Sequence, residues 1–186
     1  MTALSSILLD RLKSGSFVVS VFVPIFALAL VASPPVSGEV IEATDTHYRL
    51  SLSATASSPP AELWNRLVHP ERWWNPLHSY SGQAENLSLD ARAGGLWRED
   101  WDGGSVAHGR VLLVREEQLL RMEALFGPLQ GIGAYVVWTI TITAEGDGSR
   151  VTFDEVATAA PGSKLDELAG AVDGVKEQAI NLLTGT

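Results

Sequence analysis

Residues 61–76 read AELWNRLVHPERWWNP, and the folded part of the chain can be understood as a pocket built against this stretch. Leu63 and Leu67 are four residues apart, which is the spacing that places two side chains on one face of a helix. Trp64 and Val68 repeat that spacing one position later. The stretch therefore predicts a short helix with one apolar face.

A proline and a tryptophan pair follow this predicted helix. Pro70 ends the helix, because proline lacks the N–H group that a helix interior needs. Trp73 and Trp74 come too soon afterwards for a long linker, so we expect a second short helical turn to place both rings on the same apolar surface. There they would form a lid or a wall over a cavity.

Composition limits the class of protein. With 186 residues, of which 46% are hydrophobic, the chain can bury the core of one domain without covalent staples. It has no cysteine, which excludes disulfides, thiolate metal sites and cysteine nucleophiles. The net charge of -9, without a cluster of lysine or arginine, argues against nucleic acid as a partner and against purely electrostatic docking on a membrane.

The first 38 residues have the layout of a secretory signal peptide. Arg11 and Lys13 precede an apolar run over 17–32, and the small, turn-prone sequence SPPVSG follows it. We therefore predict export to the periplasm or cell envelope, with residues 39–186 as the folded domain. Cleavage is expected after Ala29 or at the end of the SPPVSG sequence.

An uncleaved membrane anchor is the alternative interpretation of this segment. The apolar run nearly reaches the roughly 20 residues that span a bilayer. Contact with a membrane is expected only if the segment is retained.

Residues 48–55 begin a series of predicted strands. Their apolar and polar residues alternate, which is typical of a strand with one buried face. Turn-forming sequences separate this strand from the later ones, so neighbouring strands should pair as hairpins. The seven predicted strands are residues 48–55, 84–90, 96–101, 106–116, 119–125, 135–144 and 150–157. Between the fifth and sixth, residues 126–133 predict a mobile, glycine-rich loop that covers an apolar surface.

A long amphipathic helix is predicted to close the chain. Ser163 is the expected N-cap, with Asp166 three residues later. The apolar stripe repeats every three to four residues and consists of Leu165, Leu168, Val172, Val175, Ala179 and Leu182. The predicted class is α+β: a strongly curved sheet of seven antiparallel strands around a C-terminal helix, with two short helices after the first strand.

This order of elements resembles the helix-grip fold of the SRPBCC superfamily, which includes START, pollen-allergen and polyketide cyclase relatives. It is most similar to the bacterial branch related to the activator of Hsp90 ATPase. The matching motifs are ATASSPPAELW at 54–64, PERWW at 70–74, AGG at 93–95, GRV at 109–111, GSRV at 148–151 and the closing helix. The resemblance implies a cavity between sheet and helix for a lipid or another bulky apolar molecule. It carries over no catalytic set, because relatives include enzymes, carriers and binding modules.

Strand parity predicts which residues line that cavity. Trp97, Glu99 and Trp101 share one face of their strand, and Phe153 and Glu155 share one face of another. The predicted ligand-binding residues are Trp73, Trp74, Trp97, Glu99, Trp101, Met122, Trp138, Phe153 and Glu155.

Four residues are candidates for acid–base catalysis: Glu99, Glu155, His78 and Tyr80. A carboxylate facing an apolar cavity should have a raised pKa and could move a proton on an enolisable ligand. The alternative is that either carboxylate reaches solvent or pairs with an arginine, for which the candidates are Arg98, Arg110 and Arg121. His108 is expected on the outer face of its strand.

The sequence predicts neither a metal nor a cofactor. No two histidines have the i, i+2 or i, i+4 spacing of a metal site, and no nucleophile elbow or phosphate-binding loop is present. Three functions therefore remain. The favoured one is a carrier or sensor that binds an apolar molecule, followed by a cofactor-free cyclase or dehydratase. The third is a protein-interaction module like the Hsp90 activator domain.

Overall fold

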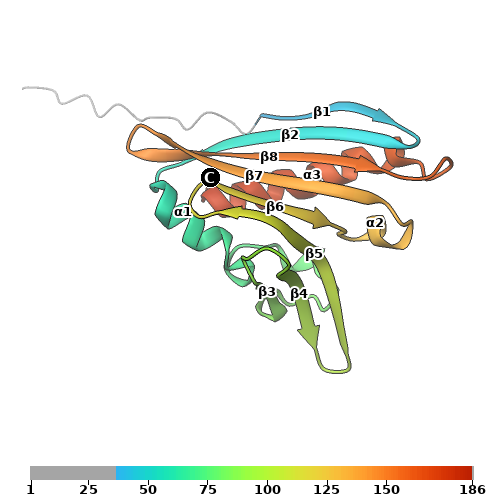
Figure 1. Ribbon diagram of the computed structural model, residues 1–186, viewed down its shortest axis with the longest axis horizontal. Coiled ribbons are helices and arrows are strands. Elements are labelled where there is room, and N and C mark those ends of the chain that lie inside the picture. The colour runs from blue at the N-terminus through green and yellow to red at the C-terminus, as the bar shows by residue number, and fades with distance from the viewer. Residues whose placement is uncertain (1–36, 186) are drawn as a thin grey trace, which may run out of the picture. The chain divides into compact units, whose positions relative to one another are not determined.

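The computed structural model describes residues 37–185. They form one eight-stranded antiparallel sheet, a long C-terminal helix and several short helices (Figure 1). This arrangement confirms the predicted α+β class and helix-grip fold. The predicted signal peptide or anchor lies, except for its last two residues, outside the described residues. Within residues 37–185, no helix combines the length and the apolar content needed to cross a membrane.

Two strands begin the described chain, short helices separate them from the later strands, and the long helix ends it. The strands are β1 Ser37–Thr44, β2 His47–Ala56, β3 Leu87–Leu89, β4 Leu96–Trp101, β5 Gly104–Arg115, β6 Leu119–Ala124, β7 Tyr135–Glu145 and β8 Gly148–Thr158. The helices are α1 Pro60–Leu67, α2 Pro128–Gly131 and α3 Leu165–Thr184, and the single 3₁₀ turns are η1 Pro70–Arg72, η2 Pro76–His78 and η3 Ala84–Asn86. Across the sheet the strands lie in the order β1-β2-β8-β7-β6-β5-β4-β3.

The edge strand β1 was not predicted from the sequence. It pairs with β2 from Ser37 opposite Ser53 to Thr44 opposite His47. Its residues 41–44 are all exposed, so they lack the alternation that marks a strand with one buried face. Cleavage after Gly38 would remove the first two residues of this strand, whereas cleavage after Ala29 would leave it whole.

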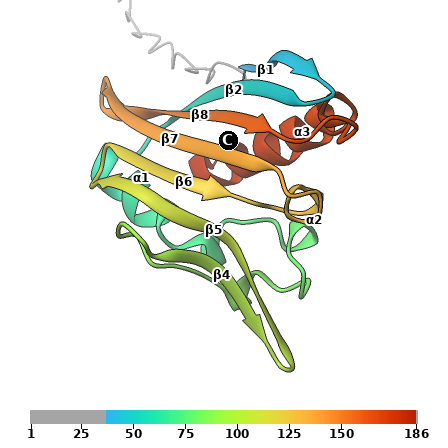
Figure 2. The same cartoon turned by 45° about the vertical axis from the view of Figure 1, so that its right-hand side comes forward.

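The helix α3 packs on the concave face of the sheet, mainly against β2 and β1 (Figure 2). Its fully buried apolar residues are Leu165, Ala169, Ala179, Ile180 and Leu183. This face is rotated from the predicted stripe, and Leu182 is 48% exposed. Consequently Leu168, Val172 and Val175 are only half-buried, since they face away from the covered side of the helix.

The N-cap residue of α3 also differs from the predicted one. Lys164, rather than Ser163, occupies the N-cap position, and its backbone is left-handed with φ of 55°. The carboxylate of Asp45, in the turn between β1 and β2, accepts the backbone N–H groups of Gly162 at 2.6 Å and Lys164 at 3.0 Å. A side chain distant in sequence therefore caps the loop that precedes the helix.

Aromatic rings fill much of the space beneath β4 to β8. Trp97 is fully buried, and its ring centroid lies 5.9 Å from that of Trp73, 5.2 Å from that of Trp74 and 5.9 Å from that of Trp138. The tryptophan pair is 4% exposed at each residue and follows η1, as the sequence predicted. The contacts of Trp97 with Trp73 and Trp74 are edge-to-face, and such packing adds to the stability that burial of the rings provides.

Replacement of Trp97 by alanine is expected to lower the free energy of unfolding by about 3–5 kcal/mol, because the large cavity left behind cannot fully collapse. Urea unfolding followed by circular dichroism measures the change. The control is Tyr135→Ala, at a residue that is 55% exposed, for which a change within about 0.5 kcal/mol is expected. Equal losses for the two variants would contradict this description of the core.

Candidate functional site

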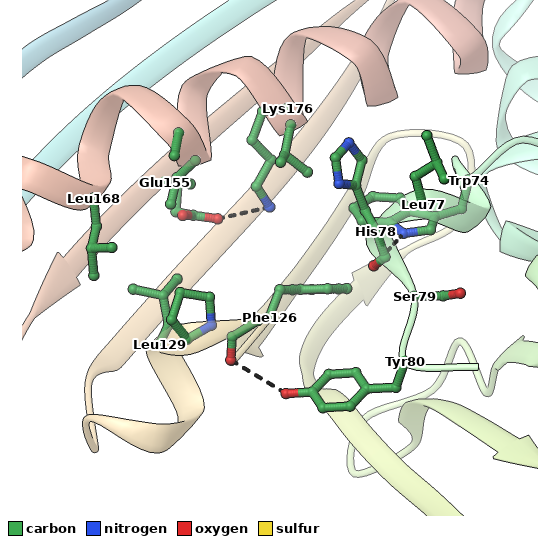
Figure 3. Close-up of a pocket in the computed structure, with 15 residues that line it drawn as sticks. Trp74, Leu77, His78, Ser79, Tyr80, Phe126, Leu129, Glu155, Leu168 and Lys176 are labelled. Carbon is green, nitrogen blue, oxygen red and sulfur yellow. Dashed lines mark hydrogen bonds and ion pairs between the residues drawn. The ribbon is translucent and has the colours of Figure 1, made fainter. Parts of the chain in front are cut away.

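A pocket of about 400 Å³ opens between α3, the connection from β6 to β7 and the segment that follows the tryptophan pair (Figure 3). We call residues 74–80 the entrance segment. From α3 the lining residues are Leu168, Ala171, Val172, Val175 and Lys176. Residues 126–129 form the facing wall, and Glu155 of β8 lies at the floor.

The apolar walls of the pocket come largely from the part of α3 that the sheet does not cover. The sheet covers one face of this helix, and the side chains of Leu168, Val172 and Val175 project from the neighbouring face. Phe126 and Leu129 lie opposite them, and Leu129 is 3% exposed. The helix thus carries more apolar surface than the sheet covers, and the excess lines the pocket.

A buried charged group lies at the floor of the pocket. Lys176 Nζ is 2.8 Å from Glu155 Oε2, and the two residues are 3% and 2% exposed. The hydroxyl of Tyr48 donates a hydrogen bond of 2.6 Å to Glu155 Oε1. We call Tyr48, Glu155 and Lys176 the floor cluster. The Lys176 ammonium also lies over the ring of Trp138, 3.0 Å from its centroid, in a cation–π contact.

Burial shifts two pKa values in the floor cluster. It raises the pKa of the Tyr48 hydroxyl, and the charge of Glu155 raises it further, so Tyr48 stays protonated and acts as a donor. Burial lowers the pKa of Lys176, while the adjacent carboxylate opposes that shift. The floor cluster thus combines a protonated hydroxyl, a carboxylate and a lysine, all three almost fully buried.

A second buried pair lies behind the entrance segment. His108 Nε2 is 2.9 Å from Glu99 Oε2, and the two residues are 1% and 0% exposed. The Glu99 carboxylate also accepts the backbone N–H groups of Tyr80 at 2.9 Å and Ser81 at 2.5 Å. Glu99 therefore fixes the end of the entrance segment to the sheet.

Burial and hydrogen bonding oppose each other in this second pair. Burial raises the pKa of the Glu99 carboxyl, but the hydrogen bonds from Ser81, Tyr80 and His108 outweigh it and hold the pKa below its usual value. Burial lowers the pKa of His108, and the Glu99 carboxylate opposes that shift.

A β-bulge turns His108 inward, so the expectation that it lies on the outer face of its strand is wrong. Trp97 pairs with Gly109 and Arg98 pairs with Ala107, which leaves His108 as the extra residue of β5. An extra residue reverses the alternation of side chains along the rest of a strand. The imidazole consequently stacks on Phe126, with ring centroids 5.1 Å apart and an angle of 12° between the planes.

The entrance segment is also fastened near its exposed side. Asn75 Nδ2 donates a hydrogen bond of 2.9 Å to Gln178 Oε1 of α3, and a ring nitrogen of His78 lies 3.1 Å from the same oxygen. The Tyr80 hydroxyl donates to the carbonyl of Gly127 at 3.4 Å, across the mouth of the pocket (Figure 3). These exposed bonds hold the entrance segment against α3 and against the facing wall of the pocket.

The structure brings three of the four catalytic candidates to the pocket. Glu155, His78 and Tyr80 line it. Glu99 does not belong to the lining, and its carboxylate binds the backbone N–H group of Tyr80 instead. Within residues 37–185, neither carboxylate pairs with an arginine: Glu99 pairs with His108, and Glu155 pairs with Lys176. The arginines that were considered bind other groups: Arg98 pairs with Asp100, Arg110 with Glu123, and Arg121 donates to Thr139.

The predicted ligand-binding residues divide between the pocket and its surroundings. Trp74 and Glu155 line the pocket. Six others are fully or almost fully buried and do not belong to the lining. They are Trp73, Trp97, Glu99, Met122, Trp138 and Phe153. Trp101 covers Gly104 at the hairpin between β4 and β5, where a Cβ would come within 2.6 Å of its ring. A direct contact of any of them with a ligand stays a prediction.

Sequence reasoning missed two members of the floor cluster. Lys176 lies four residues after Val172 and four before Ile180, so a charge interrupts an otherwise apolar helix face. That interruption is a readable signal of a buried cation with a partner. Tyr48 lies on the inward face of β2, where its hydroxyl needed a buried acceptor. In the part of the chain that the structure describes, no three His, Cys, Asp or Glu side chains gather where they could hold a metal ion.

The fold agrees with comparisons to known proteins. A family model described as "Activator of Hsp90 ATPase homolog 1-like protein" matches residues 57–184. The chain therefore belongs to this family, within the SRPBCC superfamily that the sequence motifs predicted. A search of curated proteins finds no match.

Several solved bacterial structures share the fold. Protein Ms6760 from Mycobacterium smegmatis has a TM-score of 0.55 and 21% identity, over 81% of this chain and 96% of that one. A Rhodobacter sphaeroides protein has a TM-score of 0.53 and 19% identity, over 80% and 97%. A Rhizobium leguminosarum protein has a TM-score of 0.52 and 20% identity, over 82% and 100%. At these identities the likeness concerns the fold alone.

Replacement of Glu99 by glutamine is expected to lower the free energy of unfolding by about 2 kcal/mol near neutral pH, because two backbone N–H groups lose a charged acceptor. The folded-state pKa of Glu99 is below its ordinary value of 4.5. Its carboxylate therefore contributes stability above that pH, and the contribution is lost as the pH falls through the folded-state pKa. The difference between wild type and variant should shrink in acid.

Urea unfolding over a series of pH values measures this difference. Glu116→Gln removes an exposed carboxylate in a turn and serves as the control. A wild-type advantage over Glu99→Gln that stays constant or grows in acid would show that Glu99 is not held as a carboxylate.

Proposed function

We propose that the protein binds a bulky apolar small molecule or lipid in the pocket between α3, the entrance segment and residues 126–129. The observation that carries the proposal is the half-buried apolar face of α3, formed by Leu168, Val172 and Val175. These side chains pack only in part against the core and line an open volume of about 400 Å³. An apolar ligand would complete their burial and gain roughly 25 cal/mol per Å² of apolar surface removed from water.

The size and lining of the pocket support this function. Small-molecule sites typically have volumes of about 300–1,000 Å³, with apolar walls and a few converging polar groups. Here the polar groups converge at the floor, where Glu155 and Lys176 meet. Family membership supports the same function, because the superfamily fold is one of ligand-binding and cyclase-like proteins.

The mouth of the pocket offers a path for the ligand. Leu77 is 84% exposed and Tyr80 is 54% exposed, and both line the pocket. Exposed apolar side chains at a rim can contact an entering ligand before it is fully buried. We infer that the entrance segment moves as a gate when its exposed bonds to Gln178 and Gly127 break.

We further propose that the protein acts outside the cytoplasm. This proposal rests on the signal-like segment at residues 1–38, and fractionation of cells tests it directly. A chaperone-binding role has weaker support, because it rests on the description of the family alone.

Filling the pocket should abolish ligand binding without unfolding the protein. Val172→Trp places an indole in the open volume, so the affinity for the neutral dye Nile red is expected to fall at least about tenfold. Fluorescence titration measures the affinity, and circular dichroism verifies the fold. The control is Leu182→Trp, on the same helix but exposed and outside the pocket. Failure of wild-type protein to bind the dye, or equal loss in both variants, would contradict the proposal.

A second candidate is a cofactor-free enzyme, favoured by the presence of the Glu155 carboxylate on the pocket floor. Glu155 would take a proton from the carbon next to a ligand carbonyl and return one to the same enolate. In deuterated water, wild-type protein should then exchange the α-hydrogens of a long-chain methyl ketone faster than buffer does, and Glu155→Gln should not. Mass spectrometry of the recovered ketone measures the exchange. Exchange at the buffer rate with wild-type protein would exclude this chemistry for the ketone.

A further inference from the structure

The ammonium of Lys176 is incompletely satisfied by the protein. It has three N–H groups, and its contacts are the ion pair with Glu155 at 2.8 Å and the ring faces of Trp138 at 3.0 Å and Phe126 at 5.1 Å. Among the described residues, no acceptor lies in a direction that gives Lys176 Nζ a well-directed hydrogen bond. Lys176 lines the pocket although the residue is only 3% exposed.

An unsatisfied buried donor of this kind has a high cost. A buried polar group without its hydrogen bonds loses the solvation that water would provide, and the loss is larger for a charged group. The cost disappears if a bound molecule supplies an acceptor. Lys176 Nζ lies beside the floor of the pocket, where the end of an apolar ligand would arrive (Figure 3).

The charge of the floor determines which acceptor fits. Glu155 and Lys176 carry opposite charges and cancel, and the Tyr48 hydroxyl already donates to Glu155. A ligand carboxylate would add an uncompensated negative charge next to Glu155, in an apolar and largely dehydrated site. A neutral acceptor, such as an ester, ketone or alcohol oxygen, would take a hydrogen bond and leave the charges balanced.

We propose that the pocket selects amphiphiles that have an apolar body and one neutral hydrogen-bond-accepting oxygen, and that Lys176 is the residue that binds this oxygen. The proposal rests on the proposed function, since it specifies the ligand class for the same pocket. Glu155 and Tyr48 act as positioning residues: the carboxylate holds the ammonium, and the hydroxyl holds the carboxylate. Free carboxylates of the same length are excluded by the charge of Glu155.

The test compares each of three ligands across variants, so that the different hydration of the free ligands cancels. The ligands are decane, methyl decanoate and decanoate, and displacement of Nile red gives their affinities. In Glu155→Gln/Lys176→Met the floor is neutral and has no ammonium, so methyl decanoate should lose about tenfold in affinity while decane changes less than about twofold. In Glu155→Gln alone the carboxylate that repels an anionic ligand is gone and Lys176 remains to pair with it, so decanoate should bind about tenfold tighter than it does to wild type.

Lys164→Met provides the matched control, because it removes an exposed lysine that pairs with Glu167 outside the pocket. It should leave all three affinities unchanged. The proposal is overturned if methyl decanoate and decane respond equally to the double substitution, or if decanoate binds no better to Glu155→Gln.

A measurement on wild-type protein covers the case in which the variants do not fold. The infrared stretch of the ester carbonyl in bound, isotope-labelled methyl decanoate should shift to lower frequency than in hydrocarbon solvent, because an ammonium donates to it. A frequency equal to that in hydrocarbon would overturn the role of Lys176. If neither Nile red nor any of the three ligands binds to wild-type protein, the proposed function itself fails; binding without the expected discrimination overturns only the present proposal.

Discussion

The buried ion pair between Glu155 of β8 and Lys176 of α3 joins the helix to the sheet. Apolar residues of the helix are buried on both sides of this pair, Leu165 and Ala169 before it and Ala179 and Ile180 after it. Before the pair, the neighbouring face of the helix also carries apolar residues, and these line the pocket. The pair therefore belongs both to the buried face of the helix and to the lining of the open volume.

Stability alone is a poor explanation for such a pair. Transfer of two charges out of water costs several kcal/mol per ion before their attraction is counted, and well-packed apolar residues at such positions are often at least as stable. The cation–π contact with Trp138 and the hydrogen bond from Tyr48 offset part of that cost. What an apolar replacement could not supply is a donor at the floor of an apolar pocket. This difference favours a role in recognition.

The second buried pair serves the wall of the pocket rather than its floor. Glu99 binds two backbone N–H groups of the chain that ends the entrance segment, and His108 binds the same carboxylate from β5. Buried bonds thus hold the backbone at Tyr80, while exposed bonds hold the side chains of Asn75 and His78 against Gln178 and the Tyr80 hydroxyl against Gly127. The exposed bonds can break while the backbone at Tyr80 stays in place.

Local sequence patterns correctly predicted the strands and helices whose apolar residues keep one regular spacing from end to end. The alternation in β7 correctly buries Val136, Trp138 and Ile140, and the spacing of Leu63 and Leu67 correctly predicts α1. The spacing of apolar residues was insufficient where a single residue interrupts it. Among the residues of the site, an extra residue at His108 reverses the parity of β5, and a charge at Lys176 disguises the buried face of α3. Both residues have their partners on another element, His108 on β4 and Lys176 on β8, which a pattern within one element does not report.

A crystal structure of the protein with methyl decanoate bound tests the central claim most directly. The account predicts a chain of ligand density along Leu168 and Val172, with the ester carbonyl oxygen within hydrogen-bond distance of Lys176 Nζ. Crystals saturated with the ester in which Phe126 and the entrance segment fill the pocket, or in which the ester binds elsewhere, would contradict it.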